Sequence, residues 1–165
     1  MMMVAGLMLL ATQCFYQSQA PLQQLVVFHL QGHSALGIRS GKQLTTYASE
    51  LNEYTLGLLN SYATGERLGT SLPGPLHQVL AFGDRLILIL GKSGHLPNQQ
   101  VDMVLLQNDS PIALDRLIQQ CRPQLIIADG SNFGRYTGQW KATCQAAGVS
   151  FHDTKTAGAL VLDRP

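Results

Sequence analysis

Five polar residues near the end of the chain have side chains suited to binding a phosphate or a nucleic acid: Asp129, Ser131, Asn132, Arg135 and Lys141. The Ser131 hydroxyl and the Asn132 amide, together with backbone amides near a helix start, can hold a phosphate. Arg135 and Lys141 add positive charge. Cations beside hydrogen-bonding groups are typical of proteins that bind single-stranded nucleic acid. The sequence therefore indicates a phosphate or nucleic-acid contact in this segment.

Two aromatic residues close by, Tyr136 and Trp140, have rings on which a base can stack. Trp140 lies at helical spacing, however, which is more common for a core residue. The run Asp-Gly-Ser-Asn is also turn chemistry, because Asp and Asn bond their own backbone and Gly allows positive φ. The pattern leaves both the turn and the phosphate contact open.

A histidine and an aspartate, His152 and Asp153, stand side by side further along. Such a pair can do acid–base work. The alternative is an ordinary polar strand end that leads into a turn. A serine nucleophile is not indicated, because no GxSxG sequence surrounds Ser34 or Ser131.

One unit of alternating strands and helix must position these residues. The isoleucine-rich run before Asp129 predicts a buried strand, and α/β folds keep their sites in loops at the carboxyl ends of such strands. Arg135 and Tyr136 are predicted to lie in that loop, and Gly148 to end the following helix. The predicted elements are a strand over 125–128, a helix over 137–147, a strand over 149–152 and a closing hairpin with a strand over 159–162.

The earlier part of the chain predicts an antiparallel meander, a helix and a second hairpin. The helix would place Leu51, Tyr54 and Leu58 on one face, with its N-terminal cap near Asn52. Pro111 suits the first turn of a later helix. The predicted strands cover 25–30, 35–39, 43–48, 78–82, 85–90 and 101–106, the predicted helices cover 49–64 and 112–121, and 65–75 is predicted as a loop.

The element order predicts an α/β fold with mixed and antiparallel sheets flanked by helices, arranged as one sandwich. With 165 residues the chain is one domain by size. It is 45% hydrophobic and only 13% charged, which indicates a membrane neighbour or a large partner surface. The net charge of +1 does not favour a general polyanion binder. Three cysteines without a CxxC spacing favour neither a disulfide framework nor a structural zinc site.

The first residues form a separate segment, 1–20, ahead of the predicted domain over 21–165. Met1 to Thr12 is apolar and uncharged, too short to cross a membrane, and lacks the basic start of a secretory signal. We interpret this segment as the end of a truncated transmembrane helix. An ordinary apolar N-terminal helix is the alternative.

The order of elements and several spaced motifs resemble the C-terminal soluble region of ComEC family competence proteins, which move single-stranded DNA inward during transformation. The opening LVVFHLQGHSALGIRSGKQL resembles the family's first hairpin, and VDMVLLQND resembles its central strand. The last part of the chain resembles the family's ending at PQLIIADGSN, at Trp140-Lys141 and Cys144, and over Gly148 to Phe151 and Thr154 to Leu162. The resemblance covers about Leu25 to Leu162.

By this resemblance the domain is a degenerate metallo-β-lactamase-like fold. The active form of that fold holds two metal ions, which polarise a phosphate and generate hydroxide, and it needs an HxHxDH-type loop after the central strand. The corresponding loop here, 106–111, contains no histidine, and Asp109 alone cannot hold a metal pair. The resemblance therefore implies a non-catalytic domain with no metal and no cofactor. A metal-dependent single-strand nuclease and an unrelated membrane-anchored α/β binding module are the alternatives.

The resemblance also implies the surroundings of the domain. Its partners would be the membrane channel portion of the same family and single-stranded DNA, with a membrane contact through the apolar N-terminal segment. The domain would belong to the cell membrane and lie on its extracytoplasmic side, acting in DNA internalisation.

Overall fold

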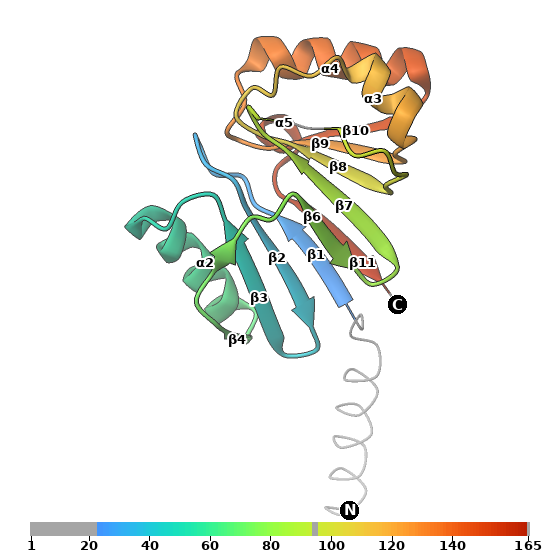
Figure 1. Cartoon of the computed structure of the whole chain (residues 1–165). Helices are drawn as coiled ribbons and strands as arrows, with labels where there is room; N and C mark the ends of the chain where they lie inside the picture. Colours follow the sequence, from blue (N-terminus) through green and yellow to red (C-terminus); the bar gives the residue numbers. More distant parts are fainter. Residues whose placement is uncertain (1–22, 94–95, 165) are drawn as a thin grey trace, which may run out of the picture.

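The computed structural model describes residues 23–93 and 96–164, and the predicted apolar helix in 1–20 lies outside this part. The elements alternate between short strands and four helices within the described residues (Figure 1). In chain order they are β1 (Gln23–Val27), β2 (Ala35–Ser40), β3 (Gln43–Ala48), α2 (Glu53–Gly65), β4 (Gly69–Thr70), β5 (Gly74–Pro75), β6 (Val79–Phe82), β7 (Arg85–Leu90), β8 (Met103–Leu106), α3 (Leu114–Cys121), β9 (Leu125–Ala128), α4 (Gly134–Ala147), β10 (Ser150–Asp153), α5 (Thr154–Ala157) and β11 (Leu160–Arg164).

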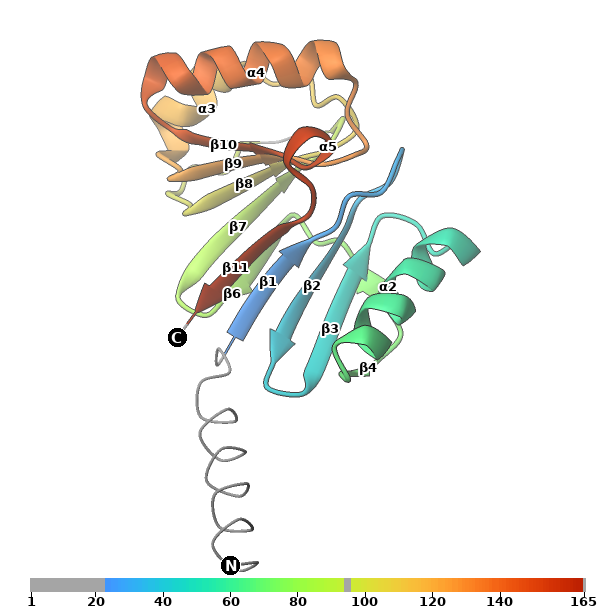
Figure 2. The same cartoon turned by 180° about the vertical axis from the view of Figure 1, so that it is seen from behind.

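The strands form two sheets. The first sheet has the order β11-β1-β2-β3-β4, with β5 also paired to β3, and its four longer strands are antiparallel. The second sheet has the order β10-β9-β8-β7-β6, and all its pairs are parallel except that of β6 with β7. Figure 2 shows β11 beside β1, in the first sheet, although it follows β10 of the second sheet in the chain.

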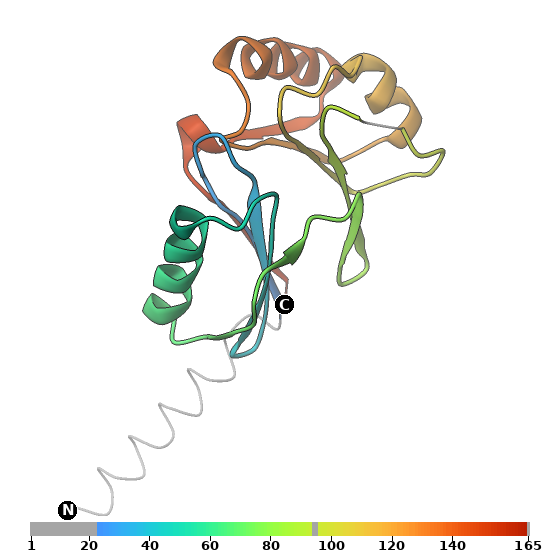
Figure 3. The same cartoon turned by 60° about the vertical axis from the view of Figure 1, so that its left-hand side comes forward.

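Helices cover the outer faces of both sheets, so the described chain forms four layers (Figure 3). Leu25 and Val27 of β1 face Ile87 and Ile127 of the second sheet in the core between the sheets. The alternate residues of β1 pack under α2, as the period of a strand requires. A third core lies between the second sheet and helices α3 and α4, and Trp140 belongs to it. The predicted sandwich of mixed and antiparallel sheets flanked by helices is confirmed.

Burial explains why the central strands form. β8 and β9 read MVLL and LIIA, and every residue of these strands except Leu125 is buried, as expected for parallel strands covered on both faces.

Asn52 caps α2 by accepting a hydrogen bond from the Thr55 amide at 2.8 Å, as predicted. Gly148 ends α4 with φ +68, a conformation that favours glycine.

Several predicted local features are wrong. β10 and β11 do not form a hairpin, because α5 intervenes and β11 joins the other sheet. Arg135 and Tyr136 lie in the first turn of α4 rather than in a loop. α3 begins at Leu114, so Pro111 precedes the helix. The segment predicted as a loop over 65–75 contains β4 and β5, and Leu51 and Tyr54 are exposed rather than packed.

Cys121 and Cys144 are buried free thiols in the core under α3 and α4. Burial raises the pKa of the Cys144 thiol to about 11 and also raises that of Cys121. Both residues therefore serve as small core residues. Within residues 23–93 and 96–164, no helix has the length and apolar character needed to span a membrane.

Candidate functional site

The candidate site lies at one edge of the second sheet, where β7, β8, β9 and β10 all end because they run parallel. Two loops dominate this edge. The β8 loop covers residues 107–113 and the β9 loop covers 129–133. The connection between β1 and β2, residues 28–34, reaches the same edge from the first sheet (Figure 1). The tertiary structure thus brings three distant segments together around the predicted Asp129 run.

Asp129 organises the β9 loop from a buried position. Its side chain is 1% exposed, and its Oδ1 accepts hydrogen bonds from the Ser131 amide at 3.0 Å, from the Ser131 hydroxyl and from Asn132 Nδ2. Ser131 Oγ in turn accepts from the Asn108 amide at 2.8 Å. The aspartate therefore orients a serine that holds the β8 loop.

Asn132 makes a second link between the two loops. Its Nδ2 donates to the Leu106 carbonyl at 2.7 Å, and its Oδ1 accepts from the Asp109 amide at 2.9 Å. Asp109 also contacts the β9 loop through its side chain, because its Oδ1 accepts a hydrogen bond from the Phe133 amide at 2.7 Å. Asn108 and Asp109 both have φ near +50, an uncommon backbone region for residues other than glycine. The bonds from Ser131 and Asn132 stabilise this conformation.

The β1–β2 connection docks against the glycine of the run. The Gly32 amide donates to the Gly130 carbonyl at 2.9 Å, and Ser34 Oγ lies 3.4 Å from Ser131 Oγ. Gly130 is so close to the β1–β2 connection that a Cβ at this position would lie 2.8 Å from the Leu30 carbonyl carbon. The predicted turn chemistry of the run is therefore confirmed, and it also joins the two sheets at this edge.

The Asp129 carboxyl is poorly matched to its surroundings. Burial raises its pKa, although hydrogen bonds from Ser131 and Ser34 and the nearby His29 partly oppose the rise. Its Oδ2 is buried and has no hydrogen-bond partner within the described residues. The ionised form is thus disfavoured in the folded state relative to the unfolded chain.

This shift predicts how stability depends on pH. The stabilisation from a protonated Asp129 is fully present below the ordinary aspartate pKa of about 3.9 and is lost as pH rises through the higher folded pKa. Asp129→Asn keeps an Oδ1 acceptor but does not titrate. We expect the free energy of unfolding of the wild type, measured by urea denaturation, to fall relative to that of Asp129→Asn as pH rises.

The exposed aspartate Asp115 on α3 supplies the control for losing one carboxylate. The same pH series with Asp115→Asn measures the background effect. The raised pKa of Asp129 is contradicted if the free energy of unfolding of the wild type, relative to that of Asp129→Asn, stays constant or increases as pH rises.

The other predicted site residues lie apart from this buried cluster. Arg135 and Lys141 are exposed on α4, where the Arg135 guanidinium lies 4.7 Å from the Tyr136 ring centroid. Trp140 is 5% exposed and packs in the core, so it is not available as a stacking platform. The contact of Arg135 and Lys141 with nucleic acid stays a prediction.

His152 and Asp153 end β10, beside the end of β9, as expected. His152 Nε2 lies 3.0 Å from the Gly158 carbonyl, and Asp153 accepts from the Lys155 amide at 2.9 Å as the cap of α5. Neighbouring residues of a strand point to opposite faces. Both side chains thus have local structural contacts, and a joint acid–base role stays a prediction.

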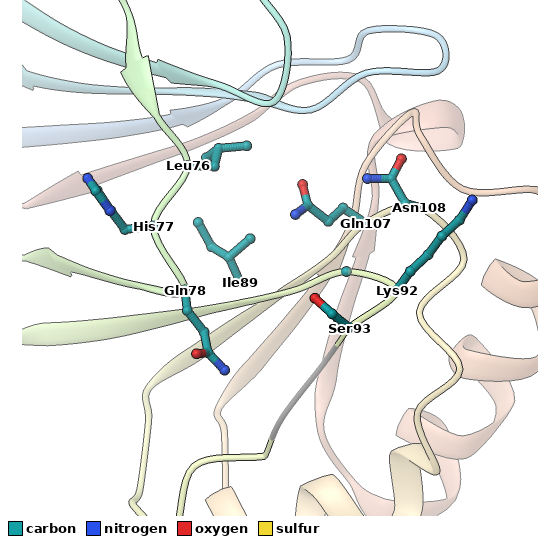
Figure 4. A pocket seen from close by; sticks show the side chains of 9 residues that line it. Leu76, His77, Gln78, Ile89, Lys92, Ser93, Gln107 and Asn108 are labelled. Atoms are coloured by element: carbon teal, nitrogen blue, oxygen red, sulfur yellow. The ribbon is translucent and has the colours of Figure 1, made fainter.

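A cleft that the sequence did not indicate opens between the β5–β6 connection and the carboxyl ends of β7 and β8. Its volume is about 570 Å³, and Lys92 is the charged residue on its wall (Figure 4). The other lining residues are Leu76, His77, Gln78, Ile89, Gly91, Ser93, Gln107 and Asn108. A signal for it was present, since Gly91-Lys92-Ser93 directly follows β7 at a strand's carboxyl end.

The residues of the β8 loop do not fit a metal pair. This loop offers two amides, one hydroxyl and the carboxylate of Asp109, whose Oδ1 already accepts the Phe133 amide. Across the described ranges, no group of three or more His, Cys, Asp or Glu residues is placed to hold a metal ion. We therefore derive no chemistry through a metal at this edge.

The chain was compared with protein families, curated proteins and solved structures. A family model described as the ComEC C-terminal domain matches residues 25–164. No curated protein and no solved structure matches the chain significantly. The family match covers both sheets and all three loops of the candidate site.

Proposed function

The chain belongs to the family of ComEC C-terminal domains, and from this premise we propose that it is a non-catalytic domain of a ComEC-like membrane protein for DNA uptake in natural transformation. Membership of this family supports a part in competence and DNA uptake. It also removes the alternative of an unrelated binding module. The non-catalytic role rests on one observation. At the position of the metal loop, the backbone amides of Asn108 and Asp109 donate to Ser131 and Asn132, and the Asp109 carboxylate accepts from the Phe133 amide, so these groups join the β8 and β9 loops.

The surroundings of the domain are part of the same proposal. The membrane channel portion of the family is its partner, the domain lies on the extracytoplasmic side of the cell membrane, and it handles single-stranded DNA without cutting it. Exposed Arg135 and Lys141 support strand contact, because phosphate contacts are made by accessible cations. Buried Asp129 and Asn132, with Ser131, contribute by shaping the loops.

Two measurements on the full chain test the lack of catalysis. After purification with zinc or manganese present, we expect no stoichiometric metal by elemental analysis and no degradation of a single-stranded oligonucleotide. One metal ion per chain, together with degradation that Asp109→Ala abolishes, would overturn the proposal in favour of the metal-dependent nuclease.

Strand handling is tested by the fluorescence anisotropy of a labelled oligothymidine. We expect Arg135→Ala and Lys141→Ala each to weaken binding about two- to fivefold, because each removes one phosphate contact. Lys42→Ala is the control, since it removes the same charge from the exposed β2–β3 turn at the other end of the first sheet. Equal losses in all three variants contradict a specific contact.

A further inference from the structure

We propose that the cleft beside the β8 loop binds one unpaired nucleotide of a single DNA strand, with Lys92 at the phosphate and Gln107 and Asn108 at the edge of the base. This inference deepens the proposed function and rests on its strand-handling part. None of the residues that the sequence singled out for DNA contact lines this cleft.

The charge of the cleft favours an anion. Lys92 is exposed at the carboxyl end of β7, and no carboxylate stands among the lining residues. The salt bridges within the described residues join His33 to Glu50, Arg39 to Glu66 and Arg164 to Asp84, so none of them neutralises Lys92. An ammonium group without a carboxylate partner in a concave site attracts a phosphate.

The remaining walls suit a base. Leu76 and Ile89 provide apolar surface, and the side chains of Leu76, Ile89 and Gln107 gather in the middle of the cleft (Figure 4). The amides of Gln107 and Asn108 offer both donors and acceptors, which a base edge requires. Gln107 Oε1 has no hydrogen-bond partner among the described residues, so a bound group can satisfy this amide after it rotates. The volume lies within the roughly 300–1000 Å³ of small-molecule sites.

The Asp129 run positions the amide wall. The backbone amide of Gln107 donates to the Leu90 carbonyl at 2.9 Å, and the backbone amide of Asn108 donates to Ser131 Oγ at 2.8 Å. The backbones of both residues are therefore held in place before any ligand arrives, which lowers the entropic cost of binding. The buried polar cluster thus supports the cleft rather than contacting DNA itself.

The shape of the site selects an unpaired nucleotide. A base must leave its stack and its partner to enter a pocket, and this costs least when the strand is already single. The same chemistry, a phosphate joined to a base, is present in a free mononucleotide. Experiments with a strand, a mononucleotide and inorganic phosphate separate these sources.

The test uses two variants of the full chain, one control variant and three probes, which are labelled oligothymidine, thymidine 5′-monophosphate and inorganic phosphate. Lys92→Ala removes the cation, and Asn108→Gly removes the amide while tolerating the left-handed backbone at this position. We expect each variant to weaken binding of labelled oligothymidine about fivefold or more, whereas Lys42→Ala changes it less than twofold. Thymidine 5′-monophosphate should shift the backbone NMR signals of Gly91, Gln107 and Asn108.

Each outcome decides the inference. In one outcome, Arg135→Ala weakens oligothymidine binding, but Lys92→Ala and Asn108→Gly leave it unchanged. This result overturns the assignment of the cleft and leaves the proposed function standing. Nucleotide-induced shifts at Gly91, Gln107 and Asn108 without any oligothymidine binding support the cleft but contradict the strand-handling role. If inorganic phosphate alone shifts the same NMR signals as much as thymidine 5′-monophosphate does, the cleft is only an anion site, and the assignment of a nucleotide is overturned.

Discussion

Replacing Gly130 by alanine is expected to lower the free energy of unfolding by about 3 kcal/mol, near the upper end of typical overpacking costs. A Cβ at this position would meet the backbone of Leu30, with the carbonyl carbon at 2.8 Å and His29 Cε1 at 2.9 Å. A backbone carbonyl cannot move aside as a flexible side chain can. The β1–β2 connection must therefore retreat, and the hydrogen bond from the Gly32 amide to the Gly130 carbonyl is weakened.

The matched control is Gly138→Ala on α4. No atom lies within 4 Å of a Cβ added there, apart from the chain neighbours and the helix's own backbone. Alanine is favoured over glycine in a helix interior by about 1 kcal/mol, so this variant should be slightly more stable than the wild type. Urea denaturation measures both changes. A Gly130→Ala variant as stable as Gly138→Ala would show that the two sheets do not meet closely at this edge.

Asn132→Asp is expected to lower the free energy of unfolding by about 4 kcal/mol at neutral pH, because it breaks a buried network and adds an unpaired charge. The substitution keeps the shape of the side chain but replaces Nδ2 by an oxygen. That oxygen would then face the carbonyls of Leu106 and Asp129 and the Asp129 carboxyl. Four oxygens, one of them from the Asp129 carboxyl, would then meet without the Nδ2 hydrogens that join them in the wild type.

Asn52→Asp provides the same chemical change at a site that tolerates it. Asn52 caps α2 with its side-chain oxygen, and aspartate caps helices about as well as asparagine. We expect this control to change the free energy of unfolding by less than about 0.5 kcal/mol. The loss in Asn132→Asp should shrink in acid, where the new carboxyl is protonated. Similar stability in the two variants would contradict the buried role of Asn132.

The sequence predicted the bounds of a strand well where two local signals coincided, namely the hydrophobic pattern of the strand and the turn residues at its ends. The bounds of β3, β7 and β9 agree with the prediction at both ends, because apolar or alternating runs meet turn residues there. The starts of α3 and α4 were predicted too early and too late, respectively. Their N-caps, Ala113 and Phe133, make no side-chain hydrogen bond, so the usual sequence signature of a helix start is absent.

The closing strand shows what local patterns cannot decide. The run over 159–162 indicated a strand, and β11 is one, but its partner is β1 at the other end of the chain. A period of two specifies a pleated, half-buried strand and says nothing about which neighbour covers its edge. The hairpin prediction failed because α5 carries the chain from one sheet to the other.

The sequence by itself determined the family, the α/β class and the turn chemistry of Asp129 to Asn132, because these depend on motifs and on contacts between near neighbours. Only the tertiary structure decided that Asp129 and Asn132 are buried supports and that Lys92 lines a cleft with Gln107 and Asn108, where no described lining residue is a carboxylate. Burial and charge environment depend on segments distant in sequence, which meet at this edge because four strands end there in parallel.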